Sequence, residues 1–339
     1  MRLAVVGCGL IGRKRALALH SDDKLVACCD SNEPLARKFG EEFGCSYYSD
    51  HSKLLSEVES DIVVVAVVNK FTRQIVIDAL KSGRHVLAEK PLGRSASEAS
   101  EMLSALSTYP SPGPHSPHPL LKTGFNHRFH PAVRKAKELL GAGTIGKPFN
   151  IRAAYGHGGR PGMEKEWRAS KDLCGGGELL DQGVHVIDLT RWFGGEITSL
   201  TGNVETKFWD MEVEDNAHVI AKTSDGVTAL FHVSWTNWKN VFSFEIFGTD
   251  GFLKITGLGG SYGPESLEIG RRKKEGGRPD VEVVEFPPED VSWKEEWKEF
   301  KNAISDGREP VGNGYDGFMA NRVIEAIYKS NKEQRTITL

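Results

Sequence analysis

The chain has 339 residues, 26% of them charged, and a formal net charge of −3 at pH 7. This length allows two domains with a substantial hydrophobic core. The weakly acidic balance provides no basic surface for nucleic acid or for an anionic membrane. No apolar run reaches the roughly 18 residues that a membrane span requires. We therefore expect neither nucleic acid nor a membrane among its partners.

The five cysteines show no spacing typical of disulfides or of a zinc site. A strand that begins at Arg2 is incompatible with a secretory signal peptide at the start of this sequence. Both features predict a cytoplasmic protein.

The first thirty residues predict a strand, a glycine-rich turn, a helix and a second strand. Residues 2–6 are apolar after Arg2, residues 7–12 read Gly-Cys-Gly-Leu-Ile-Gly, and residues 13–20 suit a helix. In a dinucleotide fingerprint, Gly7 permits the tight turn, Gly9 lets the backbone approach a pyrophosphate, and Gly12 lets helix and strand pack closely. The pyrophosphate would lie on the amides that open the helix, among them those of Leu10 and Ile11.

The second strand, at 24–29, ends in Asp30. An acid about 20 residues beyond the glycines can bind the ribose hydroxyls of adenosine and would repel a 2′-phosphate. The sequence thus predicts NAD, with NADP less favoured. The alternative is an ordinary strand–helix–strand unit in which Asp30 is merely a loop residue.

Up to residue 125, short strands alternate with helices. The predicted strands are 47–48, 61–68, 85–88 and 121–125, and the predicted helices are 33–43, 52–58, 72–82 and 95–106. This alternation predicts an NAD-binding Rossmann domain at 1–125, with a doubly wound parallel sheet. A proline-rich loop is predicted at 109–119.

After residue 146 the pattern changes to alternating strands, at 149–155, 216–222, 227–235, 242–247, 252–255, 266–269 and 281–286. Asp225-Gly226 and Asp250-Gly251 are hairpin signals. Helices are predicted at 132–140, 178–192 and 293–304. We therefore expect an α+β substrate and oligomerisation domain at 126–310 with a large open, mostly antiparallel sheet. A C-terminal helix (318–329) and short strand (336–339) within 311–339 would pack back on the first domain.

Lys90 is the first candidate catalytic residue. It follows the predicted strand at 85–88 and precedes Pro91. Ligands of open α/β sheets bind at the carboxyl ends of the strands, so this lysine could lie over a nicotinamide and donate to a substrate oxygen. The alternative is a solvated surface lysine.

Asp181 and His185 are four residues apart in the predicted helix at 178–192, and Asp188 follows three residues later. A carboxylate beside an imidazole raises its pKa and orients it, which suits a general base. Two other interpretations stay open: a helix ion pair beside a core histidine, or a metal site formed by Asp181, His185 and Asp188.

The glycine-rich stretch 157–171 carries Arg160, Trp167 and Arg168. A sugar site needs an aromatic platform and planar donors, and an anionic group needs arginine. These three residues are therefore candidate substrate contacts, unless the stretch is only a surface loop.

Taken in order, these motifs resemble the Gfo/Idh/MocA family, the group of glucose–fructose oxidoreductase and inositol dehydrogenase. The resemblance covers essentially the whole chain and rests on the fingerprint at 7–12, Glu89-Lys90-Pro91, Gly124-Phe125-Asn126-x-Arg128-Phe129-x-Pro131, and Gly-Gly-Gly-x-x-x-Asp181-x-Gly183-x-His185-x-x-Asp188.

The resemblance implies a catalytic group of Lys90, Asp181 and His185, with no metal. It implies that Glu89, Lys90 and Asn69 lie at the cofactor, and that Asn126 and Arg128 contact the substrate together with the catalytic group. It further implies a homodimer or homotetramer formed through the open sheet.

The predicted function is NAD-dependent hydride transfer to or from a secondary hydroxyl or ketone of a sugar, inositol or nucleotide-linked sugar. Two alternatives are a catalytically silent NAD-binding regulator or partner subunit, and a metal-dependent isomerase using Asp181, His185 and Asp188.

Overall fold

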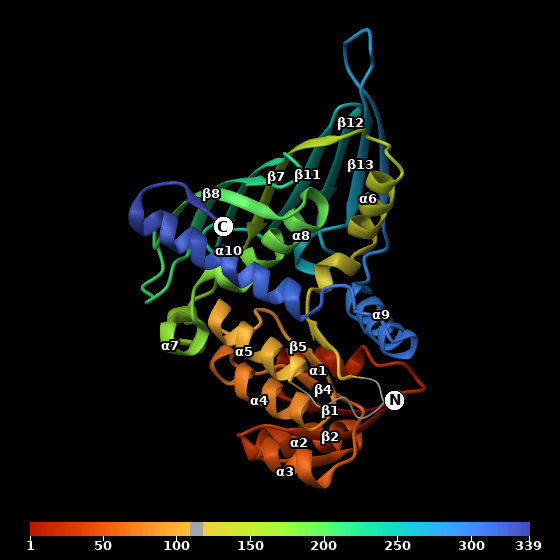
Figure 1. Cartoon of the computed structure of the whole chain (residues 1–339), viewed down its shortest axis with the longest axis vertical. Coiled ribbons are helices and arrows are strands. Elements are labelled where there is room, and N and C mark those ends of the chain that lie inside the picture. Colours follow the sequence, from red (N-terminus) through yellow and green to blue (C-terminus); the bar gives the residue numbers. More distant parts are fainter. Residues whose placement is uncertain (109–117) are drawn as a thin grey trace. The chain divides into compact units, whose positions relative to one another are not determined.

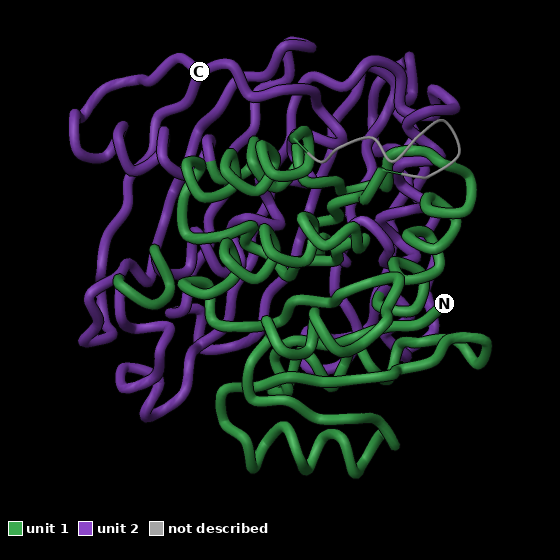
Figure 2. The backbone as a smooth tube through the Cα atoms, turned by 60° about the horizontal axis from the view of Figure 1, so that its bottom comes forward, with its two compact units in different colours: residues 1–125, 172–175, 293–321 green, residues 126–171, 176–292, 322–339 purple. Residues whose placement is uncertain are grey.

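The computed structural model describes residues 1–108 and 118–339 (Figure 1). Most of the predicted proline-rich loop at 109–119 lies outside the described residues. The chain divides into two compact units (Figure 2). The first contains residues 1–125, 172–175 and 293–321, and the second contains residues 126–171, 176–292 and 322–339.

The first unit contains a six-stranded sheet in the order β3-β2-β1-β4-β5-β6. Its strands are β1 (Arg2–Val6), β2 (Lys24–Cys29), β3 (Ser46–Tyr48), β4 (Ile62–Val65), β5 (His85–Ala88) and β6 (Leu121–Thr123). Every neighbouring pair in it is parallel. This strand order is that of a dinucleotide-binding fold, so the predicted doubly wound sheet is confirmed.

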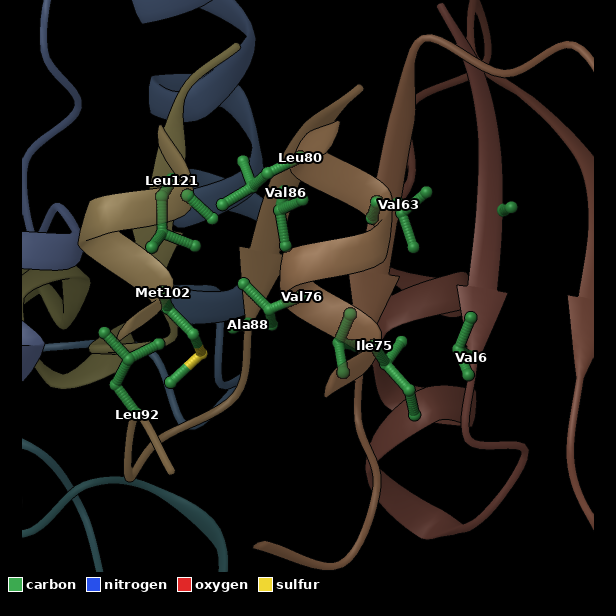
Figure 3. Packing of buried hydrophobic residues seen from close by; sticks show 14 of the residues in the cluster. Val6, Val63, Ile75, Val76, Leu80, Val86, Ala88, Leu92, Met102 and Leu121 are labelled. Carbon is green, nitrogen blue, oxygen red and sulfur yellow. The ribbon is translucent and has the colours of Figure 1, made fainter. Parts of the chain in front are cut away.

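Both faces of this sheet are covered, and its two central strands are apolar except for Arg2 at the start of β1. The helices of this unit are α1 (Leu10–Leu17), α2 (Glu33–Phe43), α3 (His51–Glu57), α4 (Asn69–Lys81), α5 (Ala96–Ser107), α9 (Ser292–Asp306) and the first part of α10 (Gly314–Glu333). On one face Val6 and Val63 pack with Val76 and Met102 of α4 and α5 (Figure 3). On the other face, Val5 and Val64 pack with side chains that include Phe39 of α2 and Phe300 of α9.

The second unit contains a nine-stranded sheet in the order β14-β13-β12-β11-β7-β10-β9-β8-β15. Its strands are β7 (Pro148–Gly156), β8 (Ile197–Glu205), β9 (Asn216–Thr223), β10 (Thr228–Ser234), β11 (Val241–Gly248), β12 (Gly251–Thr256), β13 (Ser266–Arg271), β14 (Asp280–Glu285) and β15 (Ile337–Thr338). The pairing of β7 with β10 is parallel and the other described pairings are antiparallel. The prediction of a mostly antiparallel sheet is confirmed.

Strand β8 is a strand that the sequence pattern does not predict. Only Ile197, Leu200 and Gly202 are buried along it, so the apolar alternation is weak. A Cβ at Gly202 would lie 2.7 Å from the side chain of Ile327 in α10. Close packing against α10, a helix far away in the sequence, thus contributes to this strand, and the local sequence pattern contains no sign of that contact.

The helices of the second unit are α6 (Pro131–Gly141), α8 (Val184–Gly194) and the last part of α10. The short helix α7 (Lys171–Cys174) spans residues of both units. The predicted helix at 178–192 consists of a π-helical turn at Leu179–Gly183 followed by α8. Among the described helices, none combines the length and the apolarity of a membrane-spanning segment.

Candidate active site

The glycine turn of the first unit has the geometry of a pyrophosphate cradle. Gly7 has φ = +100°, and a Cβ there would lie 2.2 Å from the carbonyl oxygen of Ala66. A Cβ at Gly12 would lie 1.8 Å from the carbonyl oxygen of Gly7. At Gly9, by contrast, a Cβ would meet no described atom within 4 Å. Gly7 and Gly12 are therefore required by packing within the protein, whereas Gly9 faces open space.

Helix α1 begins at Leu10, three residues before the predicted start, because the amide of Arg13 already donates to the carbonyl of Gly9 at 3.0 Å. The amides of Leu10, Ile11 and Gly12 thus lie in the first turn, where a helix has no acceptors of its own. Gly9 provides no side-chain cap. This helix N-terminus, next to the open side of Gly9, suits an anion such as a pyrophosphate.

Asp30 follows β2 and is tied to the same turn. Its Oδ2 accepts a hydrogen bond from the amide of Cys8 at 2.9 Å, and its Oδ1 accepts one from the amide of Asn32 at 2.9 Å. The carboxylate is half-buried and held at the carboxyl end of the sheet. A carboxylate fixed there fits the ribose of an adenine dinucleotide and disfavours a 2′-phosphate. The residues present therefore fit NAD.

Glu89 and Lys90 follow β5, and the Lys90–Pro91 peptide bond is cis. Glu89 forms a 2.6 Å ion pair with Arg15 of α1, and Arg15 forms a second one with Glu296 of α9. Burial raises the pKa of Glu89, and the charge of Arg15 partly opposes that shift. This buried network joins the Glu-Lys-Pro segment to the helix of the glycine turn, so it fixes the backbone from which Lys90 extends.

Asn69 is the first residue of α4 and is buried. Its Nδ2 donates to the carbonyl of Cys174 at 2.8 Å. Lys70 and Arg94 both bind Asp172. Within the first unit, these contacts hold residues 172–175 to the start of α4 and to Arg94, a role that the sequence does not predict for Asn69.

In the second unit, the glycine run before the π-helical turn is imposed by packing. A Cβ at Gly176 would lie 2.2 Å from the hydroxyl of Tyr328, and one at Gly177 would lie 1.8 Å from the carbonyl oxygen of Glu214. The carboxylate of Glu214 accepts from Tyr328 and from the amide of Leu179. Burial raises the pKa of Glu214. The turn that carries Asp181 is therefore anchored at its start.

Asp181 lies within this π-helical turn and is half-buried. The Nε of Arg168 donates to its Oδ2 at 3.2 Å, and the guanidinium of Arg168 stacks on the ring of Trp167 at 4.4 Å. Burial lowers the pKa of His157, and the charge of Asp181 opposes that shift. Two predicted substrate contacts, Trp167 and Arg168, thus lie beside the predicted catalytic carboxylate.

His185 is the second residue of α8 and is 3% exposed. Its ring stacks on that of His127, with centroids 3.7 Å apart and planes 16° apart. The Nε2 of His127 is 3.0 Å from the hydroxyl of Tyr155, at the end of β7. Burial, with Tyr262 nearby, raises the pKa of Tyr155 well above its ordinary range, and that of Tyr262 is raised to about 12.

Asp188 and Arg128 form a buried ion pair. The guanidinium donates from Nε and Nη2 to the two carboxylate oxygens at 2.8 and 2.6 Å. The metal interpretation needs Asp188 as a ligand, but both oxygens of its carboxylate already accept hydrogen bonds from Arg128. Within residues 1–108 and 118–339, no group of three His, Cys, Asp or Glu side chains is arranged to hold a metal ion.

The remaining predicted substrate contacts have protein partners as well. Asn126 is buried, and its Nδ2 donates to the hydroxyl of Ser292. Arg160 is exposed and donates to Glu166 at 2.6 Å. The structure thus groups Trp167 and Arg168 with Asp181, and places Asn126 next to the histidine stack.

His127, Tyr155 and Tyr262 belong to this cluster although the sequence analysis did not select them. His127 stands between two residues of the Asn126-x-Arg128 motif, and that position is the one signal that could have indicated it. Tyr155 reads as an ordinary inward residue of a strand, and Tyr262 lies in a short 3₁₀ turn, Gly260–Tyr262. Only the fold brings them to His185.

Comparison with known proteins gives matches along both units. Residues 1–110 match an oxidoreductase family with an NAD-binding Rossmann fold, and residues 133–254 match the GFO/IDH/MocA C-terminal domain. Similar proteins include D-apiose dehydrogenase of Paraburkholderia graminis, 26% identical over 99% of this chain and 89% of that protein. Myo-inositol 2-dehydrogenase of Thermotoga maritima is 28% identical over 100% of this chain and 98% of that protein.

Among solved structures, levoglucosan dehydrogenase in complex with NADH has a TM-score of 0.89 and 21% identity, covering 100% of this chain and 98% of that one. The fold is therefore shared over the full length of both chains. Two domain matches in the expected order, together with the glycine cradle and the Glu89-Lys90-Pro91 segment, show that this chain belongs to the Gfo/Idh/MocA family of NAD-dependent oxidoreductases.

Proposed function

We propose that the protein is a dehydrogenase that transfers hydride between NAD and a secondary hydroxyl or ketone of a sugar, an inositol or a nucleotide-linked sugar. The observation that carries this proposal is His185, a buried imidazole in the first turn of α8, which directly follows a π-helical turn bearing Asp181. An imidazole preceded by a carboxylate is suited to proton transfer near neutral pH.

The relatives support the class of substrate. They act, by their names, on apiose, on myo-inositol and, in a protein of Streptomyces antibioticus 28% identical over 91% of this chain and 89% of its own length, on a dTDP-linked dideoxy sugar. These compounds are carbohydrates or a cyclitol, and each carries a secondary hydroxyl or a ketone that corresponds to one. We extend that shared chemistry to this chain and leave its individual sugar open.

Each residue has a defined task in the proposed reaction. When bound, NAD supplies the hydride acceptor. His185 takes the hydroxyl proton, and Asp181 orients the ring and stabilises its charged form. Lys90 donates a hydrogen bond to the reacting oxygen and so stabilises the charge that develops there. Arg168, stacked on Trp167 and bonded to Asp181, would meet the hydroxyl groups of the substrate.

The test is the absorbance at 340 nm with NAD⁺ and a panel of free sugars, inositols, uronic acids and nucleotide sugars. Lys90→Ala and His185→Ala should each lower kcat by about 10²–10⁴-fold, while fluorescence shows NADH binding nearly unchanged. His20→Ala, half-buried in the loop between α1 and β2, is a matched control. Wild-type turnover in both variants would refute the assignment, and NADH binding without turnover on any compound would favour the regulator.

We further propose that the protein works in the cytoplasm as a homodimer or homotetramer. The cytoplasmic location agrees with five free thiols. The oligomer would form through the open sheet, where Ile220 of β9 and Leu230 of β10 pair directly and are 55% and 47% exposed. Exposed apolar pairs on a sheet are typical of an interface. Light scattering measures the molar mass of the wild type and of Leu230→Lys. We expect an oligomer for the wild type and a monomer for the variant. A variant that stays oligomeric would contradict an interface at this surface.

A further inference from the structure

We propose that His127 is a positioning residue for His185: it holds the plane of the His185 ring, and a hydrogen-bond chain keeps His127 itself neutral. The inference rests on the proposed function, because it assumes that His185 exchanges the proton with the substrate. It adds a residue that neither the motifs nor the similar proteins assign.

The stack between the two rings is close and almost parallel. The centroids are 3.7 Å apart and the planes differ by 16°. His127 is 6% exposed and lies in the 3₁₀ segment Asn126–Phe129. Its ring also packs in edge-to-face geometry with the rings of His130 and Phe242, with centroids 5.4 and 5.8 Å away. The His127 ring is therefore enclosed by aromatic groups and provides a fixed surface for His185.

A chain of hydrogen bonds determines where the proton of His127 lies. The hydroxyl of Ser292 donates to Asp290 at 2.6 Å and accepts from the Nδ2 of Asn126 at 3.0 Å. The Oδ1 of Asn126 therefore faces the Nδ1 of His127, at 3.2 Å. Since this oxygen can only accept, Nδ1 carries the hydrogen.

The other nitrogen of His127 then has the role of acceptor. In the neutral ring with hydrogen on Nδ1, Nε2 has a free lone pair. The hydroxyl of Tyr155 lies 3.0 Å away and donates to it. The phenol keeps its proton because burial raises the pKa of Tyr155 well above its ordinary range. Protonation of Nε2 would force the Tyr155 hydroxyl to turn from donor to acceptor, so the chain from Asp290 to Tyr155, as it is arranged, favours the neutral form.

The neutral state of His127 matters for the stacked pair. Two charged imidazoles with centroids 3.7 Å apart would repel each other strongly. A neutral aromatic face, by contrast, attracts a cation placed over it. The pair should therefore take up a single proton, and that proton should reside on His185.

Other titratable groups surround the pair. They are Tyr155 on β7, Tyr262 in the 3₁₀ turn, His130 with its partner Glu265, Arg128 with its partner Asp188, and Glu178 and Asp181 at the π-helical turn. The charges of Arg128 and Asp188 neutralise each other. The carboxylates at the π-helical turn favour the charged form of His185, the ring on which the proposed mechanism needs the proton.

Two substitutions separate the ring from its hydrogen bonds. His127→Ala removes the stacking surface, and we expect a fall in kcat of about 10²-fold, the typical cost of a misplaced reacting group. His127→Phe keeps a flat ring and should retain kcat within about fivefold. His20→Ala, a half-buried histidine in the loop between α1 and β2, should leave kcat unchanged. Equal kcat values for His127→Ala and His127→Phe would overturn the proposal.

The pH profile distinguishes positioning from proton sharing. If His127 never takes the proton, His127→Phe should leave the limb of kcat/KM within about half a pH unit of the wild type. Strongly coupled titrating groups interact by more than about one pK unit. A displacement of the limb larger than one pH unit would therefore refute a neutral His127.

A measurement on the wild-type protein needs neither a variant nor a substrate. Histidine ¹⁵N resonances followed from pH 8 to pH 5 should show His127 neutral, with hydrogen on Nδ1, while His185 titrates. Uptake of a proton by His127 first, or hydrogen on its Nε2, would overturn the inference. If no sugar is turned over while these resonances behave as expected, the proposed function fails, but the inference that hydrogen bonds keep His127 neutral is supported.

Discussion

The open side of Gly9 leads to a prediction that separates cofactor binding from folding. Gly9→Ala places a methyl group where the free protein has no described atom within 4 Å. The backbone there has φ = −74° and ψ = −166°, which alanine adopts without strain. Losing a glycine from the unfolded chain stabilises by about 0.4–1 kcal/mol, while alanine is a poorer N-cap by a similar amount. The free energy of unfolding should therefore stay within about 1 kcal/mol of the wild type.

NADH binding should respond quite differently. The methyl group would occupy the position of the pyrophosphate and move it away from the amides of α1. A hydrogen bond to a charged group contributes about 1.5–3 kcal/mol, so the loss of one such bond raises Kd by about 10- to 150-fold. Fluorescence titration with NADH and chemical denaturation, run on the same samples, measure the two quantities.

Two other glycines serve as controls. Gly141→Ala, where a Cβ also meets no described atom within 4 Å, should change neither quantity appreciably. Gly12→Ala should destabilise the first unit, because its Cβ would lie 1.8 Å from a backbone oxygen. If Gly9→Ala binds NADH as tightly as the wild type, the cradle is not where the pyrophosphate binds. If Gly9→Ala unfolds, the open space at Gly9 has been misjudged.

Two further predictions concern buried ionisable groups. Asp188→Asn leaves Arg128 buried without its carboxylate, which typically costs about 3–5 kcal/mol. A fall in Tm of about 10 °C is expected. An unchanged Tm with a raised KM would contradict this and would favour Arg128 as a substrate contact. His85 has its pKa lowered from 6.5 by burial, and its Nδ1 accepts from the amide of Leu120. The unfolded state then binds more protons below pH 6.5, so the free energy of unfolding should fall as pH falls from 7 to 5. His85→Asn should reduce that slope, and an identical slope in the variant would contradict this assignment.

Much of the first unit follows from local sequence. Helix α2 has its predicted bounds, because the side chain of Asn32 caps its first turn, Pro34 lies within that turn, and Gly44 ends it at φ = 67°. The strands around β4 were predictable because residues buried on both faces are apolar in succession. The start of α1 was placed too late, because a glycine turn that leads straight into a helix shows no polar cap.

The second unit shows where such prediction fails. Strand β8 has too few apolar positions to display an alternation, and the π-helical turn within the predicted helix at 178–192 has no signal of its own. Gly183 lies there, and a Cβ on it would be 3.1 Å from both Leu179 and Val233. The local helix geometry thus depends on a strand that is about fifty residues away in the sequence.

The same limit applies to the site, where residue type alone does not separate groups that meet a substrate from groups that hold others in place. Arg128 and Arg168 are both arginines with a carboxylate partner. Arg128 is 5% exposed and donates two parallel bonds to Asp188. Arg168 makes one longer bond to Asp181, and its side chain remains 33% exposed. The guanidinium of Arg168 keeps accessible donors and can still bind a hydroxyl group. The guanidinium of Arg128 could bind a substrate only by leaving the buried carboxylate of Asp188. Burial and the partner's geometry therefore favour a structural role for Arg128, and they agree with Arg168 as a proposed substrate contact.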